Sequence, residues 1–555
     1  MKILFCVTNF GFLRNFQSTI GMLAERGHRI HLVADRTDST GGMRMVEALI
    51  AAHPAITYEV SPPVKRGLWF AFSSLTRLTL DYWRYLEPRF ASAVQLRARA
   101  EQYVPAVSRW LGTWPVLRSA PCRRLLTALL KRAERVIPIR PEVMALVKRE
   151  APDLVLLTPL LYFGSRQVEH VRAARVLGIP TLLGVGSWDH LTTKGRIHEL
   201  PDYVAVWNEF QRDEARELHG VPPDRVIVTG AQAYDHWFDR SASTARDVFC
   251  QRTGISADRP YLLYLCSSPF ITPHEVGFIR RWIEAIRAHA SPFVSNVGIL
   301  IRPHPQNAEQ WADVDLAPLG NVAIWPRAGA NPIDAAAKSD YFDSIFHSHA
   351  VVGINTSGLI ESGIIGRRVY SIAAAEFATT QEGTLHFQHL KNVEGGLLRM
   401  AASFDEHLRQ LAPTLETTAP PGDDAKVRGF VKAFVRPYGL EQPATPRMAG
   451  AVEWAAAQRV SPRPEPMLRR AGRGLMVPVA FALMVANVER DRWRSWAIRG
   501  TSPVRRLARS CWKVIYPSQR TARRRVRVAA STLRTFMRGR ARAVRRIVRG
   551  APYAE

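Results

Sequence analysis

Short hydrophobic runs alternate with segments of helical periodicity along most of the chain. At the start, Ile3–Val7 and Arg29–Ala34 are typical of buried strands, and Asn15–Arg26 has the spacing of a helix that faces a core. The alternation resumes after residue 150, where the expected elements are strand Asp153–Thr158, helix Ser165–Leu177, strands Thr181–Val185 and Tyr203–Trp207, helix Glu209–His219 and strand Arg225–Thr229. Strands that alternate with helices predict a parallel sheet with helices on its faces.

A second series of alternating elements begins after Gly254. Its expected strands and helices are, in order, Tyr261–Cys266, His274–His289, Val297–Ile301, Val322–Trp325, Ile333–Phe346, Ala350–Ile354, Leu359–Ile365 and Val369–Ile372. The sequence therefore predicts an α/β protein with two tandem Rossmann-like, doubly wound domains. In such a pair the C-terminal ends of both sets of strands face a central crevice, where ligands of these sheets bind.

Length and composition agree with more than one folded domain. A chain of 555 residues exceeds one ordinary core, and 47% hydrophobic with 22% charged residues is the composition of a folded protein. We expect an N-terminal domain over 1–240 with a basic helical insertion at 65–150, and a C-terminal domain over 241–440. A linker and an Arg-rich helical tail are expected over 441–555.

Positive charge is concentrated in two of these segments. The net charge is +28, and residues 461–555 hold 24 Lys and Arg against four Asp and Glu, while residues 65–150 hold 17 against six. Segments of this kind indicate a polyanionic partner, which is a lipid surface, a nucleic acid or an anionic polymer.

The tail has the pattern of a basic amphipathic helix. Residues 521–550 contain 11 arginines and no acidic residue. The apolar residues that recur on one face of this helix are Val526, Leu533, Met537, Val544 and Val548. The residues upstream that suit a lipid headgroup region are Trp493, Trp496, Trp512 and Tyr516. The pattern favours peripheral attachment to the inner face of the cytoplasmic membrane, with a solvated or nucleic-acid-binding arm as the alternative.

Neither a spanning helix, a disulfide framework nor a metal site is predicted. The longest apolar run, Leu475–Val488, is shorter than the ~20 residues of a spanning helix, and it is expected to lie on a membrane or in a core. The five cysteines lack a C-x-x-C motif, which fits a reducing cytoplasm. The D-x-D at Asp313–Asp315 lacks a preceding apolar strand. The histidine pairs at 347 and 349 and at 386 and 389 have no third ligand, so surface or core roles are favoured.

A basic motif follows the predicted strand Val297–Ile301. In Arg302-Pro303-His304-Pro305 the two prolines fix the turn, so that a guanidinium and an imidazole can face one point. This pair suits a phosphate group. The alternative is a rigid turn with solvated side chains.

Asn355-Thr356-Ser357-Gly358 joins a predicted strand to a predicted helix. We expect Ser357 to cap that helix, and the free N–H groups of Thr356, Ser357 and Gly358 to cradle a phosphate. Glu361 falls in the first helical turn, where it either complements the helix dipole or accepts hydrogen bonds from ribose hydroxyls.

Together these features resemble the GT-B-fold glycosyltransferases. The resemblance rests on the tandem α/β layout, the Arg302–Pro305 motif, N-T-S-G-L-I-E-S-G-I-I-G-R-R-V over 355–369 and L-A-E-R-G-H over 23–28, and it covers roughly residues 1–440. It is closest to the branch that makes capsules and teichoic-acid-like polymers, which includes the CDP-glycerol glycerophosphotransferases.

The resemblance implies roles for individual residues. His304 and Ser357 would contact the phosphates of the donor, Arg302 would help to neutralise them, and Glu361 would hold the ribose. Many retaining members carry a second glutamate eight residues after the first, where this chain has Val369, so the resemblance does not extend to that mechanism. Transferases of this type stabilise the leaving diphosphate without a metal, so neither a metal nor a cofactor is expected.

The first half offers candidates for the catalytic base. The segment Gly186–His190 follows a predicted strand, and Asp189 or His190 is placed to deprotonate an acceptor hydroxyl in an inverting transfer. The alternative for Asp189 is to cap the next helix beside a core tryptophan. In the first β-α loop, Arg14 lies with Asn9 and Gly11 where related folds meet the acceptor or the donor phosphates. The loop Gln381–His386 follows the last predicted strand and is expected to reach the donor sugar.

The combined hypothesis is a bacterial, metal-independent glycosyltransferase. It would move a sugar or a polyol phosphate from a nucleotide-sugar or CDP-polyol donor, held by the C-terminal domain, to a cell-envelope polysaccharide or lipid-linked acceptor, held by the N-terminal domain. An enzyme similar to UDP-sugar 2-epimerases and an inactive membrane- or nucleic-acid-binding scaffold are the alternatives. We expect a cytoplasmic protein that associates peripherally with the anionic membrane surface through its basic tail, with nucleic acid as the less favoured partner of that tail.

Overall fold

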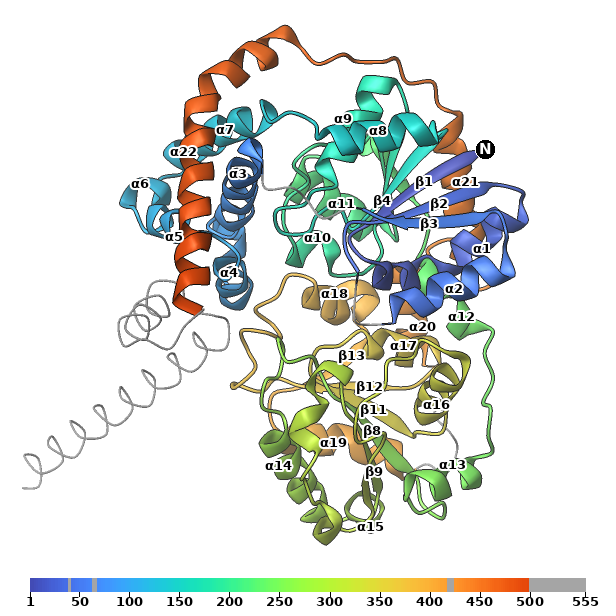
Figure 1. The fold of residues 1–555 in the computed structure, drawn as a ribbon. Coiled ribbons are helices and arrows are strands. Elements are labelled where there is room, and N and C mark those ends of the chain that lie inside the picture. Colours follow the sequence, from blue (N-terminus) through green and yellow to red (C-terminus); the bar gives the residue numbers. More distant parts are fainter. Residues whose placement is uncertain (38–40, 62–66, 417–423, 499–555) are drawn as a thin grey trace, which may run out of the picture. The chain divides into compact units, whose positions relative to one another are not determined.

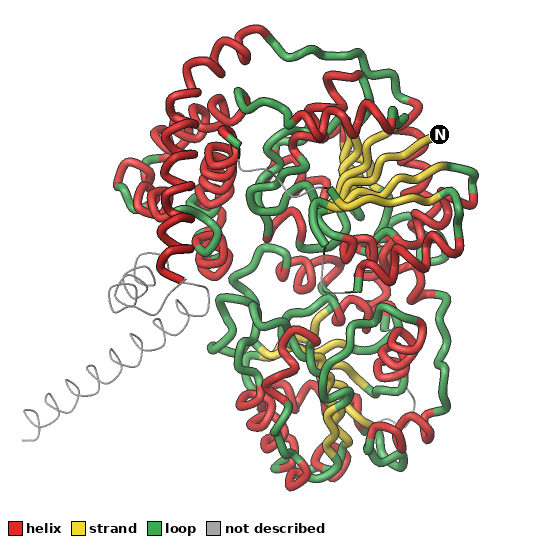
Figure 2. The backbone as a smooth tube through the Cα atoms, viewed as in Figure 1, coloured by secondary structure: helices red, strands yellow, loops and turns green. Residues whose placement is uncertain are grey.

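Two parallel sheets with helices on their faces make up most of the protein (Figures 1 and 2). The structure is a computed structural model that describes residues 1–37, 41–61, 67–416 and 424–498. The chain divides into two compact units, Met1–Lys65 with Ser73–Gly474 and Arg66–Phe72 with Leu475–Glu555. Both sheets belong to the first unit.

The first sheet has seven strands in the order β3-β2-β1-β4-β5-β6-β7, and all its pairs are parallel. The strands are β1 (Lys2–Val7), β2 (Arg29–Ala34), β3 (Ile56–Val60), β4 (Leu154–Thr158), β5 (Thr181–Gly184), β6 (Tyr203–Val206) and β7 (Val226–Val228). In the middle of the sheet, Phe5 lies opposite Leu32 on one side and Leu156 on the other. Helices cover both faces of such a sheet, so its inner strands are continuous apolar runs.

The second sheet has six parallel strands in the order β10-β9-β8-β11-β12-β13. The strands are β8 (Tyr261–Leu265), β9 (Gly298–Arg302), β10 (Val322–Ile324), β11 (Ala350–Gly353), β12 (Val369–Ile372) and β13 (Leu398–Ala401). The two sheets confirm the predicted pair of Rossmann-like domains. Because β13 follows β12, the expectation that the loop 381–386 comes after the last strand of this sheet was wrong.

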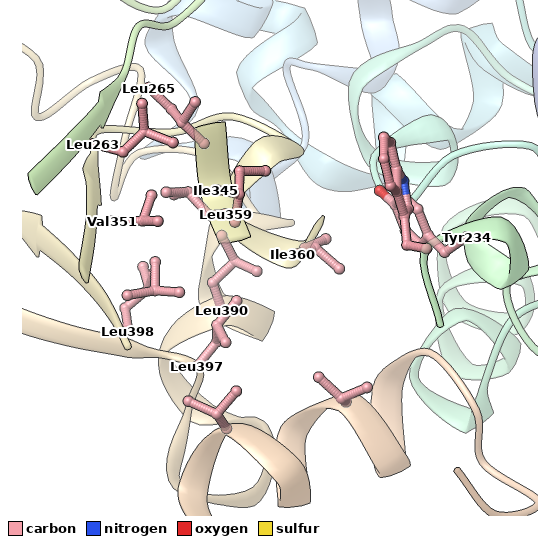
Figure 3. Packing of buried hydrophobic residues seen from close by; sticks show 14 of the residues in the cluster. Tyr234, Leu263, Leu265, Ile345, Val351, Leu359, Ile360, Leu390, Leu397 and Leu398 are labelled. Carbon is pink, nitrogen blue, oxygen red and sulfur yellow. The ribbon is translucent and has the colours of Figure 1, made fainter. Parts of the chain in front are cut away.

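Helices flank both sheets. Those of the first domain are α1 (Gln17–Glu25), α2 (Gly42–Ala52), α8 (Pro141–Glu150), α9 (Val168–Leu177) and α11 (Glu209–His219). Those of the second are α13 (Arg246–Thr253), α14 (Val276–Arg287), α16 (Ala335–Phe346), α17 (Gly358–Ile364), α18 (Phe387–Asn392), α19 (Phe404–Leu415) and α20 (Ala425–Phe434). Figure 3 shows apolar side chains of β8, β11, α16 and α17 packed together, and Tyr234 of the first domain belongs to the same buried cluster.

The helical insertion lies between β3 and α8. It comprises α3 (Leu68–Arg84), α4 (Val94–Glu101), α5 (Ala106–Gly112), α6 (Pro115–Arg118) and α7 (Ala120–Arg135). Buried Glu134 binds Arg77 of α3 at 2.9 Å and Arg172 of α9 at 2.6 Å. Burial alone would raise the pKa of Glu134, but Arg172 and Arg77 outweigh it and lower this pKa to about 2. The ion pairs therefore fix the insertion to the first domain.

Two expected boundaries need correction. Helix α8, which was expected within the insertion, packs Val143 and Val147 into the core of the first sheet, so it is part of the Rossmann-like layer. Residues 441–555 were expected to form a linker and a tail, but α21 (Ala444–Ala457) lies near the start of this stretch and packs on β4, β5 and β6, where Met448 and Val452 are buried. Its alanines and small apolar side chains let it approach the sheet closely.

The second unit contains the start of α3 and most of α22 (Met467–Ile498). The apolar run Leu475–Val488 lies in α22 and exposes several side chains, which are Leu475, Val477, Val479, Phe481 and Val485. None of the helices within the described ranges combines the length and apolarity needed to cross a membrane. The amphipathic helix expected over 521–550 and the aromatic side chains expected upstream of it lie outside the described residues.

Candidate functional site

A cavity of about 910 Å³ lies at the C-terminal ends of strands from both sheets. Loops after β1, β5 and β7 line it from the first domain, and loops after β8, β9, β10 and β11 line it from the second. Ligands of doubly wound sheets bind at this edge, because connections diverge there and leave backbone and side-chain groups free. The cavity is the main candidate for a ligand site within the described part of the chain.

All eight residues selected from the sequence line this one cavity. They are Asp189 and His190 from the first domain, and Arg302, His304, Thr356, Ser357, Gly358 and Glu361 from the second. The structure thus brings together side chains that are up to 172 positions apart in the sequence.

His304 is held as a neutral hydrogen-bond donor. Its Nδ1 accepts the backbone N–H of Gln306 at 3.2 Å, so the hydrogen of the neutral ring is on Nε2. Burial and, to a smaller extent, Arg14 lower the pKa of His304 to about 4. At neutral pH the side chain can therefore donate one hydrogen bond from Nε2 without carrying a charge.

Arg302 is bound mainly within the protein. It is 4% exposed, its Nη1 binds Asp340 at 2.9 Å, and its guanidinium lies over the ring of Tyr341 at 5.1 Å. Asp340 also binds Arg252 and accepts a hydrogen bond from Trp325, so it is held firmly in place. Nη2 of Arg302 is buried without a partner among the described residues, and it is the donor that this side chain can offer to a ligand.

Glu361 lies in a buried pair with Tyr341. The tyrosine hydroxyl donates to Oε2 of Glu361 at 2.5 Å, and burial raises the pKa of Glu361, although this hydrogen bond acts in the opposite direction. A Cβ at position 358 would lie 2.7 Å from the Tyr341 hydroxyl, so Gly358 leaves the space that this pair needs. The pair presents polar oxygens at the wall of the cavity, which suits hydroxyl groups of a ligand.

The loop between β11 and α17 differs from the expectation in one respect. Ser357 occupies the N-cap position of α17, but its side chain makes no capping hydrogen bond, because its backbone is already helical there. Asn355 is buried and donates to the carbonyl of Thr380, which anchors the loop. Thr356 and Ser357 both line the cavity.

Asp189 and His190 differ in their capacity to take up a proton. Oδ1 of Asp189 accepts the Ser187 hydroxyl at 2.6 Å, and Oδ2 accepts the Thr193 hydroxyl at 2.9 Å and faces Lys194 at 3.6 Å. Burial would raise its pKa, but Lys194 and the neighbouring histidines hold this pKa well below the usual range. Burial lowers the pKa of His190 to about 4, so this imidazole is neutral at pH 7 and has a lone pair for a proton, although it binds that proton more weakly than an exposed histidine does.

Glycine 186 allows the base candidates to approach the first β-α loop. A Cβ at this position would lie 2.9 Å from the ring of Phe16 and 3.2 Å from the side-chain nitrogen of Asn15. Without that atom, the turn after β5 packs directly on the loop that carries Arg14. The close approach explains why both segments line the same wall.

The cavity carries an excess of positive charge. Five cationic side chains line it, namely Arg14, Arg99, Lys194, Arg302 and Lys338, against two carboxylates, Asp189 and Glu361. A concave wall with this balance attracts anions and raises their local concentration. No group of three or more His, Cys, Asp or Glu side chains within the described ranges is arranged to hold a metal ion.

A glycosyltransferase and two UDP-GlcNAc 2-epimerases are among the solved structures to which this chain is similar. A glycosyltransferase from Rickettsia africae ESF-5 is 9% identical to this chain, with a TM-score of 0.47. The match covers 82% of this chain and 99% of the Rickettsia chain. A UDP-GlcNAc 2-epimerase from Neisseria meningitidis bound to UDP-GlcNAc is 11% identical with a TM-score of 0.44, covering 82% and 100%. The UDP-GlcNAc 2-epimerase from Methanocaldococcus jannaschii is also 11% identical, with a TM-score of 0.41 and coverage of 79% and 100%.

No protein-family model and no curated protein matches the sequence. Identities of 9 to 11% and TM-scores below 0.5 do not identify the activity of this chain. The chemistry of the cavity must therefore carry the functional argument.

Several residues of the cavity were not selected from the sequence. Tyr341, Lys194 and Trp237 lie within helices or just after them and belong to no local motif. His386, which ends the loop Gln381–His386 that was expected to reach the donor sugar, also lines the cavity and packs edge to face on Trp188 with 4.6 Å between ring centroids. Arg99 belongs to the insertion. The only feature of the sequence that pointed to Arg99 was the basic composition of this insertion.

Proposed function

We propose that the protein transfers a sugar or a polyol phosphate from a nucleotide-activated donor to an acceptor hydroxyl. The observation that carries this proposal is the cationic cavity at the C-terminal ends of both sheets, with neutral and hydroxyl donors on the second-domain wall. A nucleoside diphosphate needs such donors for its phosphates and a polar pair for its ribose. An acceptor needs a base on the opposite wall.

Donor binding is assigned to the second domain. Nε2 of His304 and the hydroxyls of Thr356 and Ser357 would donate to the phosphates, and the buried Nη2 of Arg302 would add a charge-assisted bond. The Glu361–Tyr341 pair would bind the ribose hydroxyls. The sequence suggested that the charge of Arg302 would neutralise the donor phosphates. Because Arg302 already forms an ion pair with Asp340, we assign more of the phosphate binding to the neutral donors His304, Thr356 and Ser357.

Acceptor activation is assigned to His190. The acceptor oxygen would attack the reacting carbon or phosphorus of the donor as its O–H bond breaks, and the proton would pass to the ring nitrogen of His190. The bond between that centre and the nucleotide oxygen breaks, and the negative charge stays on the departing nucleotide, beside the His304 donor. Asp189 lies next to His190 and raises its proton affinity electrostatically.

Nucleotide binding by His304 provides the first test. In a panel of CDP, CMP, UDP and GDP compounds, at least one should raise the melting temperature of the protein and bind in calorimetry. His304→Ala should weaken that binding about 10- to 100-fold, because a hydrogen bond to a charged group contributes roughly 1.5–3 kcal/mol.

His289 supplies the matched control for this test. Its Nδ1 accepts the backbone N–H of Ser291 at 3.1 Å, the same local geometry, but it does not line the cavity. His289→Ala should therefore bind nucleotide like the wild type. Absence of any nucleotide binding would favour an inactive scaffold, and conversion of a nucleotide sugar without an acceptor would favour an epimerase.

Peripheral membrane attachment is proposed for the basic insertion and the tail. In the insertion, Trp110 and Trp114 are 57% and 41% exposed, and their rings meet edge to face at 4.7 Å. Leu125 and Leu129 are exposed one helical turn apart on α7. Aromatic and apolar side chains among arginines are suited to an anionic lipid surface.

Flotation with vesicles that contain anionic lipid tests this attachment. The full chain should float, and the double variant Trp110→Ser, Trp114→Ser should float less, because two interfacial anchors are lost. Trp454→Ser removes an equally exposed tryptophan from α21 and should have no effect. Equal flotation of wild type and double variant would exclude these tryptophans as anchors, and nucleic-acid binding without vesicle binding would replace the membrane proposal.

A further inference from the structure

Three cations meet on the first-domain side of the cavity. Arg14 comes from the short helix η1 (Phe10–Asn15), Arg99 from α4 of the insertion, and Lys194 from the residue after α10 (His190–Thr193). Burial lowers the pKa of Lys194, and the charges of Arg99 and Arg14 lower it further. The three groups therefore lie within electrostatic reach of one another, although they come from separate segments.

Carboxylates of the protein do not balance this cluster. Lys194 lies 3.6 Å from Asp189, whereas no described carboxylate forms a salt bridge with Arg14 or Arg99. Like charges that gather in a concave wall destabilise the protein unless an anion joins them. The cluster thus has the composition of an anion-binding site.

Arg99 is held in place at the cavity. The neighbouring side chains Leu96 and Ala100 are buried in the core of the insertion, which fixes the position of α4. The Arg99 guanidinium lies over the ring of Phe270 with 5.0 Å to the centroid, and its charge acts to lower the pKa of Tyr103, which burial raises. A stacked guanidinium keeps its remaining N–H groups directed outward, where they can bind a planar or tetrahedral anion.

We propose that Arg99, Arg14 and Lys194 bind a phosphate group of the acceptor, so that the acceptor is a phosphorylated molecule. This inference rests on the proposed transferase function. The donor phosphates are assigned to the opposite wall, around His304. Lys194 lies 3.6 Å from Asp189, on the wall that carries His190, whereas Arg14 acts on both His190 and His304 and so faces both walls.

The insertion thereby acquires a role in specificity. A Rossmann-like domain does not need helices α3–α7 to form its sheet, yet α4 of this insertion supplies Arg99 to the cavity. A bidentate guanidinium recognises phosphate by geometry as well as by charge. An acceptor without the phosphate would leave Arg14 and Arg99 without an anionic partner at the cavity.

Pyrophosphate binding to the nucleotide-saturated protein tests this inference. The protein is first saturated with the nucleoside diphosphate found in the binding panel, which fills the donor site, and inorganic pyrophosphate is then titrated. We expect a second binding event, and Arg99→Gln should weaken it about 10-fold or more while nucleotide affinity changes less than about threefold. Arg97→Gln, on the same helix but outside the cavity lining, should leave both affinities unchanged.

Each other outcome is decisive. If no nucleotide binds, the transferase proposal itself fails. If nucleotide binds but pyrophosphate does not, or if Arg99→Gln weakens nucleotide instead, the acceptor-phosphate assignment is overturned. Displacement of pyrophosphate by a polyprenyl monophosphate in detergent would identify a lipid source, and displacement by a soluble sugar phosphate would identify a soluble one. Displacement by neither would also overturn the assignment.

Discussion

Replacing His190 with alanine should slow the transfer reaction about 100-fold or more and leave nucleotide affinity unchanged. A positioned base contributes roughly 10²- to 10⁴-fold, and His190 is a neutral imidazole on the wall opposite the donor-binding residues. The measurement is kcat with the donor identified in the nucleotide panel, together with the nucleotide dissociation constant from calorimetry. The rate should also fall as the pH drops toward about 4, because a protonated imidazole accepts no proton.

The variant Asp189→Asn tests whether the catalytic base is His190 or Asp189. Asp189 already accepts two hydroxyl hydrogen bonds, and its pKa is held well below the usual range, so it is a weak base. Asp189→Asn should lower the transfer rate less than His190→Ala does, because it removes only the negative charge that raises the proton affinity of the His190 imidazole. If Asp189→Asn abolishes transfer while His190→Ala does not, the carboxylate is the base and the present assignment is wrong.

The sequence revealed the strands that carry an apolar run, including the edge strands β7 and β10. Tyr261–Leu265 in β8 is a continuous apolar run, Val369–Ile372 in β12 is apolar except for Ser371, and both positions were predicted within a residue or two. β3 (Ile56–Val60) was missed because it is an edge strand with Thr57 and Tyr58 exposed, so it lacks such a run. β13, with an arginine in its four residues, was missed for the same reason.

Candidate site residues were recognisable where they directly follow a strand. His304 and Asn355–Gly358 come immediately after β9 and β11, and a strand end in a parallel sheet points to the ligand edge. Tyr341 and Arg99 lie on helices, so only the packing of the whole chain brings them to the cavity. Arg302 and Asp340 are 38 positions apart in the sequence, so no local sequence pattern predicts that they form an ion pair.

Acidification should unfold the protein between pH 6.5 and 4, because buried histidines must take up protons. His170 and His407 are 1% and 0% exposed, and both ring nitrogens of each lack hydrogen-bond partners within the described residues. Burial lowers both pKa values to about 4. The unfolded chain binds protons below about pH 6.5 and the folded chain does not, so stability falls as the pH drops, by up to about 3 kcal/mol for each histidine at pH 4.

Urea unfolding at a series of pH values measures this loss. His407→Phe should flatten the dependence on pH, because the residue packs against the rings of Tyr370 and Trp282 and phenylalanine binds no proton. His170→Leu should act in the same direction and independently, since His170 lies in α9 of the other domain. His289→Ala replaces a histidine outside the core and should leave the slope as it is in the wild type. If both core variants lose stability on acidification as steeply as the wild type, the protons are taken up elsewhere, and the neutral buried imidazoles do not set the acid limit of this fold.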